Sequence, residues 1–188
     1  MSAVFTPTRY KLSVDDYHKL GEAGILNEDS RVELIEGELI EMAPIGGPHM
    51  NIVNRLNRLL VLAVGDLGVV SIQNPVTLPP ISEPQPDISI LKPGADRLDA
   101  GVPLPGNVLL IIEVADTTLS YDRDTKLKLY AKAGIPEAWI VNVNSRCIEI
   151  YREPVTGKYT QKIERKAGDN VSCLGLPSVK LAVAEIFK

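Results

Sequence analysis

Residues 108–114 read VLLIIEV and form the most apolar stretch of the chain, yet they carry one charged residue, Glu113. A run this apolar is typical of a central strand that is buried on both faces of a sheet. An ionised carboxylate in such a strand is costly unless it is paired, hydrogen-bonded or bound to a metal ion. The sequence therefore marks Glu113 as a charge that needs a specific partner.

A second carboxylate stands at the start of another apolar run. Residues 86–91 read PDISIL, and a polar loop rich in Pro, Gly and Asp over residues 92–107 separates them from the first run. Pro86 cannot donate a ladder hydrogen bond, so it marks the beginning of the strand and makes Asp87 its first inward-facing position. If the two strands are neighbours, the carboxylates of Asp87 and Glu113 converge on a shared site.

A lysine follows on a predicted helix. Residues 116–134 turn from strand to helix, with Asp122 or Asp124 as the expected N-cap and Gly134 as the C-terminal stop. Lys126 then lies about one turn into this helix. An ammonium group in that place can reach a site at the end of the preceding strand.

The remaining segments predict a mixed α/β domain. A helix is expected after Ser13, and a hairpin over residues 31–43 turns at Glu36-Gly37, with Val32, Leu34 and Leu39 inside and most of its glutamates in water. Another helix is expected from His49 to Val64, and further strands over residues 69–73, 75–78, 138–143, 146–151 and 158–164. The strand–helix–strand step from Glu113 to Val143 favours a right-handed crossover, and the apolar residues of the tail should cover an edge of the core.

The length of 188 residues fits one domain, with residues 1–30 as an N-terminal arm and helix and residues 31–188 as the core. A hydrophobic share of 45% with 23% charged residues is typical of a globular chain rather than a disordered one. A net charge of −4 provides no global attraction to nucleic acid, so phosphate contacts must come from a local patch. The candidates for that patch are Arg55, Arg58, Arg123, Lys126, Lys128 and Lys132.

The sequence also predicts the compartment. Cys147 and Cys173 show no CxxC spacing and fit a reducing environment, although a single bridge between them stays open. No apolar run approaches the roughly 18 residues that span a membrane. The segment from Met1 to Lys11 has no apolar secretion-signal core. A cytoplasmic protein without a membrane partner is expected.

The central residues support a hypothesis of metal-dependent phosphodiester hydrolysis. Two carboxylates with open coordination positions suit Mg²⁺ or Mn²⁺, which keep waters and bind substrate phosphates. Lys126 could then stabilise charge on the phosphate. A purely structural interpretation stays open, in which Asp87 accepts loop N–H groups and Glu113 forms a buried salt bridge with Lys126.

Five segments carry a resemblance to a known family. They are VELIEGEL at 32–39, PD at 86–87, IEV at 112–114, YDRDTK at 121–126 and YAKAGIPEAW at 130–139, of which the last is the most specific. Together they resemble the PD-(D/E)XK pattern of restriction-endonuclease-like nucleases, and over nearly the whole chain a large bacterial family of predicted restriction endonucleases. The resemblance implies an α/β (α+β) fold with a restriction-endonuclease-like core, in which helices flank a mixed central sheet.

The resemblance also implies a site. It suggests a metal centre on Asp87 and Glu113 that takes Mg²⁺ or Mn²⁺, with contributions from Glu33 and from His49. The chain departs from the pattern at Ala115, where the superfamily usually has lysine.

If the site is catalytic, the lysine function must therefore pass to Lys126 on the following helix. Asp116 and Asp122 are further carboxylates close by in sequence, and they either touch the metal or cap the turn.

The resulting expectation is a Mg²⁺-dependent endonuclease acting on double-stranded DNA. Cleavage of a duplex needs two active sites, so a homodimer is expected as well. The alternative is a catalytically silent nucleic-acid-binding or regulatory module on the same fold. A glycosidase carboxylate pair is disfavoured by one Trp, six Tyr and two Phe, because sugar sites use aromatic platforms, and a serine hydrolase by the lack of GxSxG.

Overall fold

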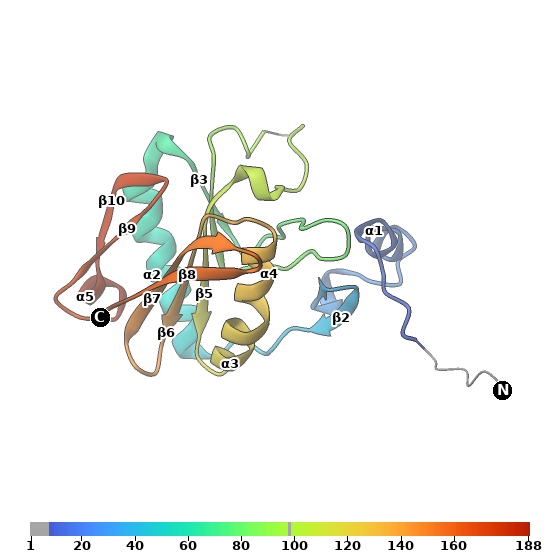
Figure 1. The fold of residues 1–188 in the computed structure, drawn as a ribbon, viewed down its shortest axis with the longest axis horizontal. Coiled ribbons are helices and arrows are strands. Elements are labelled where there is room, and N and C mark those ends of the chain that lie inside the picture. Colours follow the sequence, from blue (N-terminus) through green and yellow to red (C-terminus); the bar gives the residue numbers. More distant parts are fainter. Residues whose placement is uncertain (1–7, 98) are drawn as a thin grey trace. The chain divides into compact units, whose positions relative to one another are not determined.

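A computed structural model describes residues 8–97 and 99–188, so the first seven residues of the expected arm lie outside the described part. The chain divides into two compact units (Figure 1). The first unit comprises Met1–Met42 and Leu78–Pro84, and the second comprises Ala43–Thr77 and Gln85–Lys188. The single domain expected from the length stays a prediction, and each unit is described by itself.

The first unit begins with the predicted helix, α1 (Val14–Glu22). Its N-cap is Ser13, as expected: the Ser13 hydroxyl accepts from the Asp16 N–H at 3.1 Å, and the Asp16 carboxylate accepts from the Ser13 N–H at 3.0 Å. This capping box satisfies two backbone donors that the helix leaves open. A 3₁₀ turn, η1 (Glu28–Ser30), connects α1 to the hairpin.

The predicted hairpin is present as β1 (Val32–Ile35) and β2 (Glu38–Glu41), with Glu36 and Gly37 both at positive φ in the turn. Two positive φ values in a two-residue loop match the right-handed twist of the strands.

The expected burial of the hairpin is wrong at Leu39, which is 37% exposed, and Glu33 is a glutamate that does not face water, since it is only 4% exposed. The reason is a third chain segment: Leu34 and Glu83 exchange backbone hydrogen bonds, so β1 is flanked on both sides while β2 stays at the edge.

The second unit is built on a six-stranded mixed sheet in the order β3-β4-β5-β6-β7-β8, which confirms the expected fold class (Figure 1). The strands are β3 (Val69–Ile72), β4 (Ile88–Leu91), β5 (Val108–Ala115), β6 (Glu137–Asn142), β7 (Cys147–Val155) and β8 (Lys158–Arg165). The apolar run of the sequence is β5, which lies inside the sheet and pairs antiparallel with β4 and parallel with β6.

The strand predicted over residues 75–78 is absent from the described structure. The Thr77 N–H bonds to the Pro103 carbonyl instead of joining a ladder, and prolines stand at positions 75, 79 and 80. Because proline lacks a donor and restricts its predecessor, this segment forms a buried irregular connection.

The long helix α2 (Gly47–Val64) packs on one face of the sheet (Figure 1). It starts two residues earlier than predicted, with Pro48 in its first turn. A two-stranded ribbon, β9 (Asn170–Cys173) and β10 (Leu176–Ala182), and α5 (Val183–Ile186) share its hydrophobic cluster. The tail thus contributes to the core as predicted, whereas its ribbon was not foreseen. Short 3₁₀ turns, η2 (Gly65–Leu67) and η3 (Pro105–Asn107), complete this unit. Within the described residues, no helix has the length and apolar character to span a membrane.

The helix after β5 has three parts: α3 (Leu119–Tyr121), a π-helical turn (Asp122–Lys126) and α4 (Leu127–Lys132). The expected N-caps, Asp122 and Asp124, are wrong because the N-cap is Thr118, four residues before Asp122. The Thr118 hydroxyl donates to Asp122 at 2.6 Å, and Asp122 is buried inside the helix.

A buried carboxylate, Glu149, links this helix to strand β7. Glu149 of β7 is 1% exposed and accepts from Arg123 and Tyr151, and Lys162 Nζ lies 3.1 Å away. Burial alone would raise the pKa of Glu149, but the hydrogen bonds from these three groups outweigh it and lower the pKa to about 2.

We expect the substitution Glu149→Gln to lower the free energy of unfolding by about 2 kcal/mol, because three charge-assisted or hydroxyl contacts lose their anionic acceptor. The wild-type contribution is fully present above the usual pKa of 4.5 and is lost as the pH falls through about 2. Urea unfolding at several pH values measures both effects. The control is Glu164→Gln, directly opposite on β8 and exposed, which should change stability by less than about 0.5 kcal/mol. Equal effects of both variants would contradict this account.

Candidate active site

The site predicted around Asp87 and Glu113 begins with the pairing of two strands. The antiparallel register joins Ile88 of β4 to Ile112 of β5, so one step further along the ladder Asp87 faces Glu113. The Asp87 carboxylate accepts from the Val114 N–H at 2.8 Å. The expectation that the two strands are neighbours is confirmed, and this contact anchors Asp87 at the end of β5.

Glu113 is a buried carboxyl group of the site. It is 4% exposed, accepts a hydrogen bond from the Tyr130 hydroxyl, and lies 3.3 Å from Lys126 Nζ. Burial raises the pKa of Glu113 to about 8; Lys126 opposes the rise, and the charges of Asp122 and Asp87 add to it. Burial therefore disfavours the charged form of this carboxyl group, and the ammonium group of Lys126 offsets part of that cost.

His49 lies in the first turn of α2 and contacts the other carboxylate. Its Nε2 is 3.0 Å from the Asp87 carboxylate, and its side chain is 15% exposed. The hydrogen bond to Asp87 raises the pKa of His49; burial opposes this, and the charges of Asp87, Asp116 and Asp122 support it. Nδ1 of His49 is buried and has no hydrogen-bond partner among the described residues.

Lys126 owes its place to an irregular helix. Asp122 and Lys126 are the first and last residues of the π-helical turn, and both are buried. Such turns inside α-helices are frequent at functional sites, because the extra residue per turn changes which side chains share a face. Here the turn places a buried acid and a buried base on the side of the helix that meets β5.

Glu33, which the resemblance adds to the site, belongs to the first unit. It is buried on β1, and its charge, with that of Glu83, adds to the effect of burial in raising the pKa of Tyr17. Its contribution to the site of the second unit stays a prediction.

Sequence reasoning missed Tyr130 as a functional candidate and did not foresee the burial of Asp122. The signal for Tyr130 was its position four residues after Lys126, which puts both side chains on one helical face. For Asp122 the sequence carried no such signal, because the position of a buried carboxylate inside the helix depends on where the helix starts.

A further acidic cluster was also missed. Ligand atoms of Cys147, Glu149 and Glu164 lie within 4.8 Å of one another on β7 and β8. Basic side chains already neutralise both carboxylates: Arg123 and Lys162 bind Glu149, and Lys166 Nζ is 2.9 Å from Glu164. A cation would have to displace these partners.

The residues around Asp87 fit a divalent cation better. Asp87, Glu113 and Asp122 supply hard oxygen donors. The charges of Asp122 and Asp87 raise the pKa of Glu113, and Lys126 is the positively charged group next to Glu113. Nδ1 of His49 is buried and has no hydrogen-bond partner among the described residues, which is a second indication of a ligand at this site. Among the expected phosphate contacts, Arg123 and Lys126 are engaged in ion pairs.

Comparison with known proteins adds two findings. A family described as "Putative restriction endonuclease" (Uma2) matches residues 14–184. A crystal structure described as that of a putative nuclease belonging to DUF820 from Anabaena variabilis has the same fold, with a TM-score of 0.75 at 18% sequence identity, over 94% of this chain and 97% of the other. No curated protein matches the chain. The family match covers most of the chain, and the protein therefore belongs to the Uma2 family of restriction-endonuclease-like proteins.

Proposed function

We propose that the protein is a metal-dependent endonuclease that hydrolyses phosphodiester bonds of double-stranded DNA. The observation that supports this most is the convergence of Asp87 and Glu113 from two antiparallel neighbours, with Lys126 3.3 Å from the buried carboxyl group. A carboxyl group with a pKa of about 8 at the end of a central strand is costly to the fold and is typical of a functional site. Membership of the family points to the same chemistry.

Asp87 and Glu113 are the residues that would hold Mg²⁺ or Mn²⁺, with Asp122 close by. When bound, the ion polarises the phosphodiester and lowers the pKa of a coordinated water. Tyr130 orients Glu113 through its hydroxyl, and the Val114 N–H and His49 fix the Asp87 carboxylate. Lys126 keeps a positive charge where negative charge grows on the phosphate.

A second candidate function is a catalytically silent binding or regulatory module. It is favoured by the ion pairs that Glu113 and Asp87 form with Lys126 and His49, because such pairs can stabilise a fold without any metal. The two candidates differ in whether the same carboxylates are needed for cleavage.

Cleavage of plasmid DNA with Mg²⁺ or Mn²⁺ tests the proposal. We expect Asp87→Asn, Glu113→Gln and Lys126→Met each to lower the rate by at least about 100-fold, because each removes charge from the reacting centre. The matched controls are Asp124→Asn, an exposed acid on the same π-helical turn, and Lys180→Met, an exposed lysine of β10 that is not among the candidate phosphate contacts. Both should retain activity within about twofold. Circular dichroism of every variant verifies folding.

Two outcomes would contradict the nuclease. Cleavage that persists unchanged in Asp87→Asn would identify a contaminant as its source. A folded wild-type protein that binds duplex DNA without cutting it, with either ion, would favour the silent module.

Metal binding should become tighter as the pH rises toward the pKa of Glu113. Glu113 must lose its proton to bind a cation, so below about pH 8 the apparent affinity for Mn²⁺ should rise about tenfold per pH unit, with close to one proton released per ion. Calorimetry in buffers of different ionisation enthalpy measures the release. Glu113→Gln should abolish this pH dependence, whereas His49→Gln should keep the part that belongs to Glu113. Binding of Mn²⁺ without proton release at pH 7 would exclude Glu113 as a ligand.

We propose a homodimer in the cytoplasm as the active form, because each strand of a duplex needs its own cut. Light scattering coupled to size-exclusion chromatography, at micromolar concentration, should give twice the mass of one chain, which is 20.5 kDa. A strictly monomeric species that nicks one strand at a time would contradict the dimer and leave the chemistry standing.

A further inference from the structure

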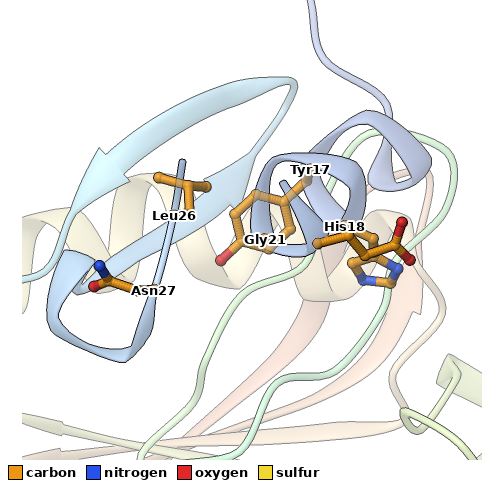
Figure 2. A pocket seen from close by; sticks show the side chains of 6 residues that line it. Tyr17, His18, Gly21, Leu26 and Asn27 are labelled. Atoms are coloured by element: carbon orange, nitrogen blue, oxygen red, sulfur yellow. The ribbon is translucent and has the colours of Figure 1, made fainter. Parts of the chain in front are cut away.

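The first unit contains a pocket that is separate from the residues assigned above to metal binding. It has a volume of about 410 Å³ and is lined by Tyr17, His18, Gly21, Glu22, Leu26 and Asn27 (Figure 2). Its walls come from α1 and from the segment that precedes η1, so local structure of one unit builds all of it. Pockets that hold small ligands have volumes of this order.

Gly21 leaves free space in the wall of the pocket. Glycine inside a helix is destabilising relative to alanine. No atom lies within 4 Å of a Cβ built on Gly21, and its φ is not in the positive range where glycine is required. Neither packing nor backbone geometry of the described residues accounts for the missing side chain. What its absence provides is free space in the wall of the pocket.

His18 gives the pocket an oriented polar group. Its Nε2 lies 3.0 Å from both carboxylate oxygens of Glu83, and Glu83 is 5% exposed. A buried carboxylate that engages one ring nitrogen fixes the orientation of the imidazole. Nδ1 is then the ring nitrogen that can meet a ligand.

Tyr17 lies beside His18 in the wall of the pocket, with the two ring centroids 6.1 Å apart. The Tyr17 hydroxyl donates to the Val32 carbonyl at 3.0 Å, which holds the phenol ring in place, and Leu26 adds an apolar surface. The Asn27 side-chain oxygen accepts from the Asp29 N–H at 2.9 Å, so its amide group is oriented with the NH₂ as the remaining donor.

We propose that this pocket binds a nucleobase that carries an exocyclic amino group, presented by an unpaired part of the nucleic-acid substrate. An aromatic wall stacks on a base, and imidazole, amide and carboxylate groups recognise its polar edge. The carboxylate of Glu22 favours an amino donor and disfavours phosphate. The inference rests on the proposed function for the source of the base, and it assigns to the first unit a role in substrate recognition that does not involve the metal.

Saturation-transfer NMR with deoxyguanosine, deoxyadenosine, deoxycytidine and thymidine tests the proposal on the whole protein in EDTA. We expect the three amino-bearing nucleosides to bind and thymidine to bind at least about fivefold more weakly, because it lacks the amino donor. Gly21→Leu fills the pocket and should weaken binding about tenfold or more while the protein stays folded. The control is Lys19→Leu, which adds the same side chain to α1 away from the pocket and should bind as wild type.

A further variant, His18→Gln, should weaken binding about fivefold, because it loses the orientation imposed by Glu83. The proposal is overturned if no nucleoside binds, if thymidine binds equally well, or if Gly21→Leu binds as wild type. Asp87→Asn and Glu113→Gln should bind nucleosides normally. A wild-type protein that binds nucleosides but does not cleave DNA therefore speaks against the nuclease alone, and one that cleaves DNA but binds no nucleoside speaks against the pocket alone.

Discussion

The burial of one carboxyl group at the end of β5 is the constraint on which the site of this protein depends. Glu113 is placed there by a strand whose other residues are apolar, and the surrounding sheet excludes the water that would solvate its charge. Its neighbours supply what water does not: Tyr130 donates to it and Lys126 provides a positive charge. The remaining cost is visible in the raised pKa, since Asp87 and Asp122 add repulsion to the effect of burial.

The other buried charges of the second unit show what a purely structural solution looks like. Glu149 is as buried as Glu113, but hydrogen bonds from Arg123, Tyr151 and Lys162 lower its pKa to about 2. Glu149 has enough hydrogen-bond donors to stabilise its negative charge, and Glu113 has not. A buried carboxyl group whose pKa stays raised beside two further carboxylates is the environment in which a divalent cation improves the energy of the site.

Much of this arrangement could be predicted from the sequence, because it depends on local rules. The alternation around Glu36-Gly37 indicated the hairpin, Ser13 indicated the start of α1, and the apolar run of residues 108–114 indicated a central strand. Where local rules failed, a tertiary contact decided the outcome. Thr77 bonds to Pro103 and not to a strand, Glu33 is buried because residues near Glu83 pair with β1, and the ribbon β9–β10 forms only by packing on the core.

The sequence by itself determined which residue types lie on which element: an acid at the start of β4, an acid near the end of β5, a lysine on the helix that follows. These follow from periodicity and from the positions of prolines and glycines, which act within a few residues. Only the tertiary structure decided that Asp87 faces Glu113, that His49 reaches Asp87, and that the helix contains a π-helical turn that buries Asp122 with Lys126. Strand register and helix start are set by packing between segments far apart in the chain, and no local pattern encodes the distance between their side chains.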